Sequence, residues 1–95
     1  MKWSASLAWR IEFDPAAVDE LAGLDRAVQK RILKVLRERI APLVDPRSIG
    51  EALRGSQLGG LWKYRVGDYR LICDIRDDVI LIVVLRIGHR REIYR

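Results

Sequence analysis

The alternation of apolar and polar positions at the start of the chain predicts a strand followed by a helix. Residues 8–13 alternate with period two, which is typical of a half-buried strand with its large apolar side chains on one face. Asp14 and Pro15 follow, and these residue types suit the N-cap and the first turn of a helix. We expect this helix to end at Gly23 in a left-handed C-cap.

A second helix is predicted from Asp25, an N-cap residue type, to just before Pro42. Its apolar positions recur every four residues, at Val28, Ile32, Leu36 and Ile40. Its opposite side is basic, with Arg26, Lys30, Lys34 and Arg37. A basic helix face is more often a solvated surface than a binding face, and both interpretations stay open. The short connection to the first helix predicts an antiparallel helical hairpin.

The second half of the chain predicts a loop and then three strands. Residues 45–60 contain four glycines and a proline, which indicates a connecting loop with one helical turn near Ile49–Leu53. Gly67 and Asp68 form a two-residue hairpin turn, and Gly88 is expected to end the last strand. The predicted strands are residues 61–66, 69–75 and 79–87.

These elements predict an α+β fold. The first strand must join the three-stranded antiparallel meander to bury its apolar face, which gives a four-stranded sheet with the helical hairpin on one side. The other side of the sheet is left partly open. We expect residues 1–95 to form a single domain, in which residues 1–7 are either a loose N-terminal arm or an artefact of a late start.

Composition narrows the class of protein. The net charge of +5 in 95 residues makes a polyanionic partner plausible, although an inert basic surface explains it equally well. Cys73 is the one cysteine, so no intramolecular disulfide can form, and its flanking residues predict a small core side chain. Neither a signal peptide nor an apolar run of membrane-spanning length is evident, so we expect a cytoplasmic protein that contacts no membrane.

Three cations of the predicted meander lie close together. Lys63 and Arg65 are two residues apart, so they share a face of their strand. Pairing across the Gly67–Asp68 turn places Arg65 opposite Arg70. Opposed like charges destabilise a hairpin, and a bound anion relieves the repulsion. The alternative is neutralisation by Asp68, Asp74 or Glu92.

The residue types available restrict the chemistry. One His, one Cys and scattered acids match no metal-ligand spacing, and neither a catalytic triad nor a phosphate-binding glycine loop is present, so no cofactor is expected. A cluster of Lys and Arg with one His and one Tyr can stabilise a pentavalent phosphate and transfer protons. RNA supplies its own nucleophile, the 2′-hydroxyl, which a protein need only align and deprotonate.

Residues 61–72, LWKYRVGDYRLI, and residues 84–94, VLRIGHRREIY, resemble the signature of the RelE/ParE toxin superfamily. Residues 9–13 and the spacing of the helical hairpin agree with this resemblance, which covers nearly the whole chain. It implies a RelE-like fold and a toxin of a type II toxin–antitoxin module. It further implies a ribosome-dependent endoribonuclease, which cleaves mRNA in the ribosomal A site by 2′-hydroxyl attack on the adjacent phosphate.

The resemblance also implies the site residues. Its catalytic set is Lys63, Arg65, Arg70, Arg90 and Tyr94, to which we add His89, and its RNA-binding set is Lys63, Arg65, Arg70, Arg86 and Arg91.

The expected roles follow from the chemistry of each side chain. Lys63 or Arg65 orients or deprotonates the 2′-hydroxyl, and Lys63 is the better base because an arginine stays protonated. Arg70 holds the scissile phosphate. Arg90 stabilises charge at the leaving oxygen, and Tyr94 stacks on a base. His89 stands where the type member has lysine, and its ordinary pKa near neutrality suits proton transfer; a solvated residue beside a turn is the equal alternative.

A RelB-like antitoxin is the expected partner, with a helix laid along the helical hairpin and groove so that it masks the cations. Operator DNA would be contacted only through the antitoxin. Two other functions stay open. One is a ParE-like inhibitor of DNA gyrase, and the other is a non-catalytic toxin homologue that serves as antitoxin partner and co-repressor.

Overall fold

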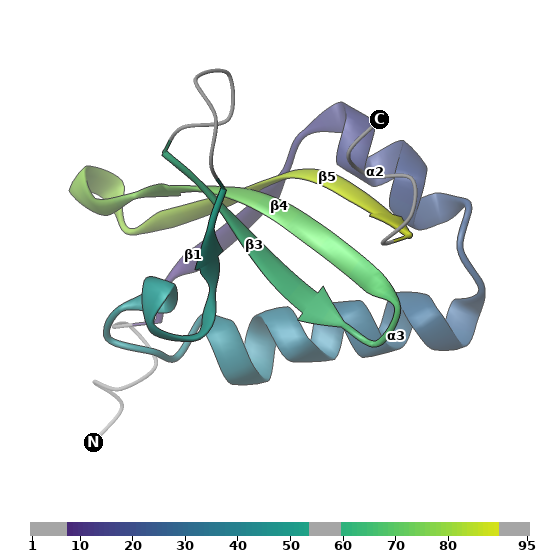
Figure 1. The fold of residues 1–95 in the computed structure, drawn as a ribbon, viewed down its shortest axis with the longest axis horizontal. Helices are drawn as coiled ribbons and strands as arrows, with labels where there is room; N and C mark the ends of the chain where they lie inside the picture. The colour runs from purple at the N-terminus through teal and green to yellow at the C-terminus, as the bar shows by residue number, and fades with distance from the viewer. Residues whose placement is uncertain (1–7, 54–59, 90–95) are drawn as a thin grey trace.

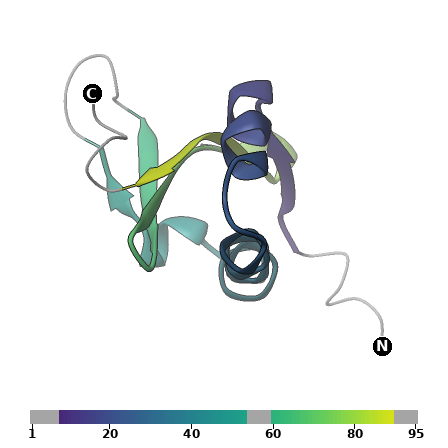
Figure 2. The same cartoon turned by 90° about the vertical axis from the view of Figure 1, so that its right-hand side faces the viewer.

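A computed structural model describes residues 8–53 and 60–89 of the chain. They form two helices packed on a five-stranded mixed sheet, as Figures 1 and 2 show. The helices are α2 (Pro15–Ala22) and α3 (Arg26–Val35), which continues into the π-helix η1 (Leu36–Ile40); the 3₁₀ turns are η2 (Pro46–Ile49) and η3 (Asp77–Val79). The strands are β1 (Arg10–Phe13), β2 (Glu51–Ala52), β3 (Leu61–Val66), β4 (Tyr69–Arg76) and β5 (Leu81–His89).

The sheet has the strand order β1-β5-β4-β3-β2, in which β1 is parallel to β5 and all other neighbours are antiparallel. This confirms the predicted α+β class, the order of strand, helical hairpin and meander, and the joining of the first strand to the meander. The sheet curves around α3, and α2 lies beside the β1–β5 end (Figure 2).

One core lies between the helices and the concave face of the sheet. Its fully buried members include Ile32, Leu36 and Ile40 of the α3–η1 segment, together with Leu71 and Cys73 of β4. Cys73 has no exposed surface, which confirms that it is a core residue. No helix among the described residues covers the opposite, convex face of the sheet (Figure 2).

Helix α2 begins as predicted but ends differently. The Asp14 carboxylate accepts a hydrogen bond of 3.1 Å from the Ala16 N–H, and Pro15 opens the first turn. Gly23 has φ of −80°, so the predicted left-handed C-cap is wrong. The side-chain amide of Gln29 instead donates to the carbonyl groups of Leu21 and Leu24, at 3.0 and 2.9 Å. These hydrogen bonds from α3 satisfy carbonyl groups at the end of α2. In many helices, a left-handed glycine allows backbone N–H groups to bond such carbonyls instead.

The apolar spacing of four residues explains why α3 becomes a π-helix. An α-helix turns about 100° per residue, so positions four apart drift by about 40° around the axis at each step. The wider π-helical turn over Leu36–Ile40 offsets this drift, and Leu36 and Ile40 both stay buried. Asp25 occupies the N-cap position, as predicted, but its side chain makes no capping hydrogen bond.

Two predictions in the second half of the chain are wrong. The helical turn expected at Ile49–Leu53 lies earlier, at η2, because Asp45 accepts a hydrogen bond from the Arg47 N–H and Pro46 starts the turn. The predicted four-stranded sheet has a fifth strand, because residues Glu51–Ala52 pair with Lys63 and Trp62 at its edge.

The last strand is also displaced from its predicted bounds, from 79–87 to 81–89. Ile80 turns the chain with φ of +51°, and the ladder with β4 continues past Gly88 to the pair Tyr69–His89. No helix among residues 8–53 and 60–89 is long and apolar enough to span a membrane.

Candidate functional site

Three cations lie on the convex face of the β3–β4 hairpin. Arg65 and Arg70 are paired across the ladder, which confirms the predicted register, and Lys63 lies two residues before Arg65 on the same face. The alternate residues of β3, Tyr64 and Val66, are buried in the core on the opposite face. Period-two alternation therefore places the three cations together and outside the core.

Arg70 is held in place by the hairpin turn. Its side chain is buried, with the residue 7% exposed, and one guanidinium nitrogen donates to the carbonyl groups of Gly67 and Tyr69 at 3.3 and 3.1 Å. A guanidinium has five N–H donors, so this anchoring leaves donors for an anion. Gly67 makes the turn with φ of +60°. Arg65, opposite Arg70, is exposed.

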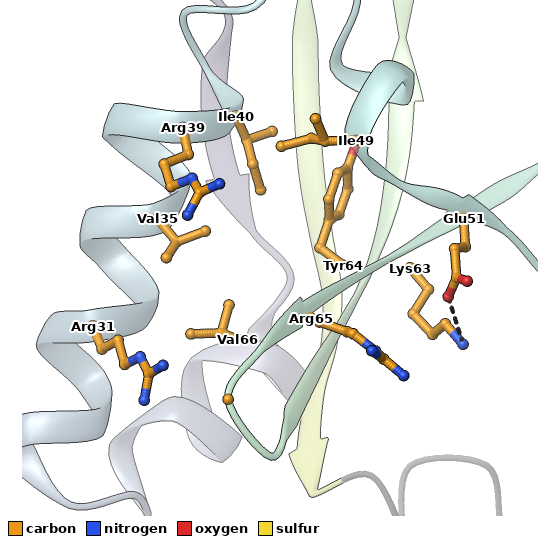
Figure 3. A pocket seen from close by; sticks show the side chains of 11 residues that line it. Arg31, Val35, Arg39, Ile40, Ile49, Glu51, Lys63, Tyr64, Arg65 and Val66 are labelled. Atoms are coloured by element: carbon orange, nitrogen blue, oxygen red, sulfur yellow. Dashed lines mark ion pairs between the residues drawn. The ribbon is translucent and has the colours of Figure 1, made fainter.

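Glu51 of β2 is the acid that sequence reasoning missed. Its carboxylate lies 3.1 Å from the Lys63 ammonium nitrogen (Figure 3). The hydrogen bond and charge of Lys63 lower the pKa of Glu51, and the charges of Arg65 and Arg70 lower it further. All three cations therefore act on one carboxylate. Neither Asp68 nor Asp74, two of the acids proposed for this role from the sequence, forms an ion pair with Arg65 or Arg70. The third, Glu92, lies outside the described residues.

Glu51 was missed because its position depends on a long-range contact. It lies in a glycine-containing segment that local sequence rules assign to a loop. Pairing of Glu51 with Lys63 across twelve residues brings the two side chains together. Four residues of alternating character would have signalled a strand, but β2 has only two residues.

A groove runs between α3 and β3 beside these cations. Its volume is about 480 Å³, and Val35, Ile40, Ile49, Tyr64 and Val66 provide its apolar lining. Figure 3 shows the side chains of Arg31 and Arg39 extending from the helix side toward β3, and those of Lys63 and Arg65 on the far side of the strand. Arg31, Val35 and Arg39 are spaced by four residues, a signal that was available in the sequence.

Beyond Lys63, β3 has an edge with no described strand beside it. The residues of β2 pair only with Trp62 and Lys63, while β3 continues to Val66 along the groove. In an antiparallel hairpin, alternate residues direct their backbone groups to opposite sides. Because Val66 and Tyr69 flank the two-residue turn, the backbone N–H and C=O of Arg65 point away from β4 and toward this edge.

Arg86 is held against α2. Its guanidinium forms a two-pronged ion pair with the Glu20 carboxylate, with a shortest distance of 2.8 Å, and the same carboxylate accepts a 2.8 Å hydrogen bond from the Ile87 N–H. Burial raises the pKa of Glu20, but the bonds from Arg86 and Ile87 outweigh it and the pKa is lowered. Arg86 is paired with Ile72, two residues from Arg70 on the same face of the sheet, but its guanidinium is bound by Glu20 rather than by Glu51.

His89 lies at the end of β5, on the face opposite to the cation cluster. It is paired with Tyr69, and the two rings meet edge to face with centroids 5.8 Å apart. The neighbouring residue, Gly88, is paired with Arg70. His89 is therefore close to the cluster along the sheet but its side chain shares the face of Tyr69. The predicted site residues Arg90, Arg91 and Tyr94 lie outside the described residues.

Trp62 and Tyr69 pack against the core. Within residues 8–53 and 60–89, no group of three His, Cys, Asp or Glu side chains is placed to hold a metal ion. The arrangement that remains is a cluster of one lysine and two arginines around one carboxylate, in which Arg65 is exposed, Lys63 is partly exposed and Arg70 is buried.

Comparison with known proteins identifies relatives over most of the chain. Residues 11–94 match the family model described as the ParE toxin of the type II toxin–antitoxin system parDE. The chain is 41% identical over 51 residues to Toxin RelG of Mycobacterium tuberculosis, which covers 54% of this chain and 58% of that protein. The chain thus matches a little over half the length of this curated relative.

The fold matches solved toxin–antitoxin structures. A chain of the RelBE2 complex of Mycobacterium tuberculosis superposes with a TM-score of 0.80 and 26% identity, covering 90% of this chain and 95% of that one. The intact RelBE complex of E. coli gives a TM-score of 0.66 and 25% identity, with 86% and 96% covered. The archaeal RelE–RelB complex of Pyrococcus horikoshii gives a TM-score of 0.66 and 25% identity, with 90% and 98% covered.

Proposed function

The chain belongs to the RelE/ParE superfamily of toxins of type II toxin–antitoxin systems, and we propose that it is a ribosome-dependent endoribonuclease that cleaves mRNA. The observation that carries this proposal is the cluster of Lys63, Arg65 and Arg70 around the Glu51 carboxylate, on a sheet face that no described helix covers. The cluster already holds one anion of the protein itself, which supports binding of a phosphate beside that carboxylate.

The reaction needs few protein groups. The 2′-hydroxyl oxygen attacks the adjacent phosphorus, the bond to the 5′ oxygen breaks, and the products are a 2′,3′-cyclic phosphate and a 5′-hydroxyl. One base must take the 2′ proton and one acid must supply a proton to the leaving oxygen. Cations stabilise the additional negative charge of the pentavalent phosphate. In our proposal Arg70, anchored at the turn, and Arg65, opposite it, bind the scissile phosphate.

The ion pair of Lys63 with Glu51 changes the roles that the sequence suggested. The Lys63 ammonium forms an ion pair with the Glu51 carboxylate at 3.1 Å, and an ammonium group cannot accept a proton. We therefore assign Lys63 to charge stabilisation. Glu51 is deprotonated and lies within the cluster, so its carboxylate becomes the proton acceptor for the 2′-hydroxyl.

Proton donation to the leaving oxygen is assigned to the end of β5 and the residues that follow. His89 acts from the opposite face, so this role requires RNA to pass around the end of the strand. Arg90 remains the proposed charge stabiliser at the leaving oxygen, Tyr94 the proposed base-stacking group, and Arg91 a proposed RNA contact. The pair of Arg86 with Glu20 supports a structural role for Arg86 rather than RNA binding.

The groove between α3 and β3 is the proposed docking site of an antitoxin. Its apolar lining and the cations Arg31 and Arg39 fit an amphipathic acidic segment. A segment seated there would lie beside Lys63 and Arg65 and would mask both. The toxin–antitoxin complexes among the structural neighbours support such a partner. Contact with operator DNA would then occur only through the antitoxin.

The proposed site is tested by cleavage of a reporter mRNA in a translating extract, read by primer extension. Wild type should cut within the reading frame, whereas Arg70→Ala and Glu51→Gln should each reduce the cleavage rate at least roughly 100-fold, the usual contribution of a charge-stabilising or proton-transfer group. Arg76→Ala serves as a matched control, because Arg76 pairs with Asp74 at the far end of the same strand. Cleavage by Arg70→Ala at the wild-type rate would show that the site assignment is wrong.

The same extract distinguishes the endoribonuclease from a ParE-like gyrase inhibitor, an alternative that the match to a ParE toxin family keeps open. A gyrase inhibitor would leave the reporter mRNA intact and would produce gyrase-linked breaks in supercoiled DNA. Those breaks, with no mRNA cleavage, would replace the endoribonuclease proposal.

A further inference from the structure

A second basic surface lies on the outward side of α3, away from both the cation cluster and the groove. We call it the α3 stripe: Arg26, Lys30, Lys34 and Arg37. All four side chains are exposed. Lys30 and Lys34 are each two residues from the fully buried Ile32, which places them about 200° around the helix, on the solvent side.

The charges of the stripe are not balanced within the described part of the chain. Of the seven charged residues between 26 and 40, six are cations and the one acid is Glu38. None of the six forms an ion pair with a described residue, although Arg47, Lys63, Arg76 and Arg86 all do. Six of the nine described cations that form no ion pair therefore lie in the α3–η1 segment.

This arrangement costs folding stability. Like charges four residues apart on a helix destabilise it, and Arg26–Lys30 and Lys30–Lys34 are two such pairs. The first turn of α3 also carries Arg26, a cation that the helix dipole disfavours there, with Asp25 at the N-cap before it. A bound polyanion removes both penalties.

The chemistry of the stripe fits a nucleic-acid backbone better than a protein or a membrane. A stable protein interface needs an apolar centre, and the large exposed apolar residues are Val18, Val44, Ile49, Val79 and Ile80, none of which lies on α3. A helix that lies in a membrane surface inserts its apolar face, but the apolar face of α3 is buried in the core. A phosphate backbone requires only positive charge at suitable spacing.

We propose that the α3 stripe docks on the phosphate backbone of double-helical ribosomal RNA, as a second nucleic-acid contact separate from the cleavage site. The helical segment from Arg26 to Arg37 spans roughly 16 Å, enough for several successive phosphates of a strand. This inference rests on the proposed function, because it supplies the ribosome as the body that holds the toxin.

The stripe explains how an open site can act on a flexible substrate. The cation cluster lies on a convex sheet face and cannot by itself fix a single strand in line for attack. Anchoring of α3 to a rigid RNA helix would set the position of the sheet relative to mRNA. An antitoxin in the groove would contact Arg31 and Arg39 on the other flank of the helix and leave the stripe exposed.

The test compares two variants that each lose two positive charges. Lys30→Gln/Lys34→Gln changes the stripe, and Arg10→Gln/Arg76→Gln changes two exposed residues of the sheet. Glutamine preserves helix propensity, and removal of a like-charge pair leaves α3 no less stable, so folding should be intact and is checked by thermal unfolding. Binding to a 16-base-pair RNA duplex is measured against salt by fluorescence anisotropy, and binding to 70S ribosomes by cosedimentation.

Loss of two phosphate contacts should lower the slope of log K against log salt by about 1.8, equivalent to roughly 60-fold weaker duplex binding at 0.1 M salt. The stripe variant should also be lost from the ribosome pellet, while the sheet variant behaves nearly as wild type. Equal losses in the two variants would indicate a general charge effect and overturn the proposal. A DNA duplex of the same length is measured in the same way. Loss of binding to that DNA duplex with ribosome binding intact would also overturn the proposal, because the surface would then face DNA.

Failure of the proposed function gives a different pattern. If wild type leaves mRNA intact but binds ribosomes through Lys30 and Lys34, the endoribonuclease proposal fails and the docking surface stands. If wild type cleaves ribosome-bound mRNA and the stripe variant binds and cleaves equally well, only the docking surface fails.

Discussion

The carboxylate of Glu20 links helix α2 to the end of β5, and its removal should destabilise the fold. β1 pairs with β5 only as far as Val84, so the later part of β5 lacks a described strand on that side. The Glu20 carboxylate occupies this edge, where it accepts a hydrogen bond from the Ile87 N–H and pairs with Arg86. Glu20→Ala leaves a partly buried backbone donor and a guanidinium without these partners.

The loss of unfolding free energy in Glu20→Ala depends on how exposed each interacting group is. The side chains of Arg86 and Glu20 are 48% and 28% exposed, so solvent screening limits their ion pair to about 0.5 kcal/mol. The 2.8 Å bond from Ile87 to a charged acceptor contributes about 1.5 kcal/mol. Glu20→Ala should therefore cost about 2 kcal/mol, and the melting temperature of a domain of this size should fall by about 10 °C.

Urea unfolding followed by circular dichroism measures this cost. Asp19→Asn is the matched control, because it removes one negative charge from the neighbouring exposed position and should change stability by less than about 0.5 kcal/mol. A double-mutant cycle with Arg86→Ala should give a coupling energy of about 0.5 kcal/mol. If Glu20→Ala costs no more than Asp19→Asn, the Glu20 carboxylate does not stabilise the end of β5.

Three further predictions concern stability and reactivity. Tyr64→Phe should cost about 1–2 kcal/mol in urea unfolding, because it removes the 2.7 Å bond to the buried Pro46 carbonyl; an unchanged midpoint would contradict this. Burial raises the pKa of Cys73 to about 12, so a thiol reagent should label it only after urea unfolding, not at once at pH 8. The pKa of Glu20 is lowered from 4.5, so its ionised carboxylate stabilises the fold above pH 4.5 and this contribution is lost as the pH falls below that value. In Glu20→Gln, the free energy of unfolding should therefore decline less steeply with falling pH, as urea unfolding at several pH values would show.

Local sequence signals predicted the elements that bury a regular apolar pattern. The hairpin register followed from the two-residue turn at Gly67–Asp68, which fixes Arg65 opposite Arg70 without any long-range contact. The joining of the first strand to the meander also followed, because the alternating face of residues 8–13 had only the meander against which to pack, whereas the fifth strand did not.

The remaining features depend on contacts between distant residues. The C-terminus of α2 is capped by Gln29 of the next helix, so Gly23 has no need of a left-handed conformation. Glu51 reaches the cation cluster only through pairing of a two-residue strand, which is too short to produce a periodic pattern. Arg86, which looks in the sequence like another member of the basic set, is paired with Glu20 of a distant helix.

We propose that the cation cluster around Glu51 cleaves mRNA on the ribosome. The most direct test is the chemistry of the RNA ends after purified wild-type protein is added to ribosomes that are translating a defined message. We expect upstream fragments that end in a 2′,3′-cyclic phosphate and downstream fragments that begin with a 5′-hydroxyl. The same message without ribosomes should give no such fragments. Intact message on translating ribosomes, or fragments with 5′-phosphate ends, would contradict the proposal.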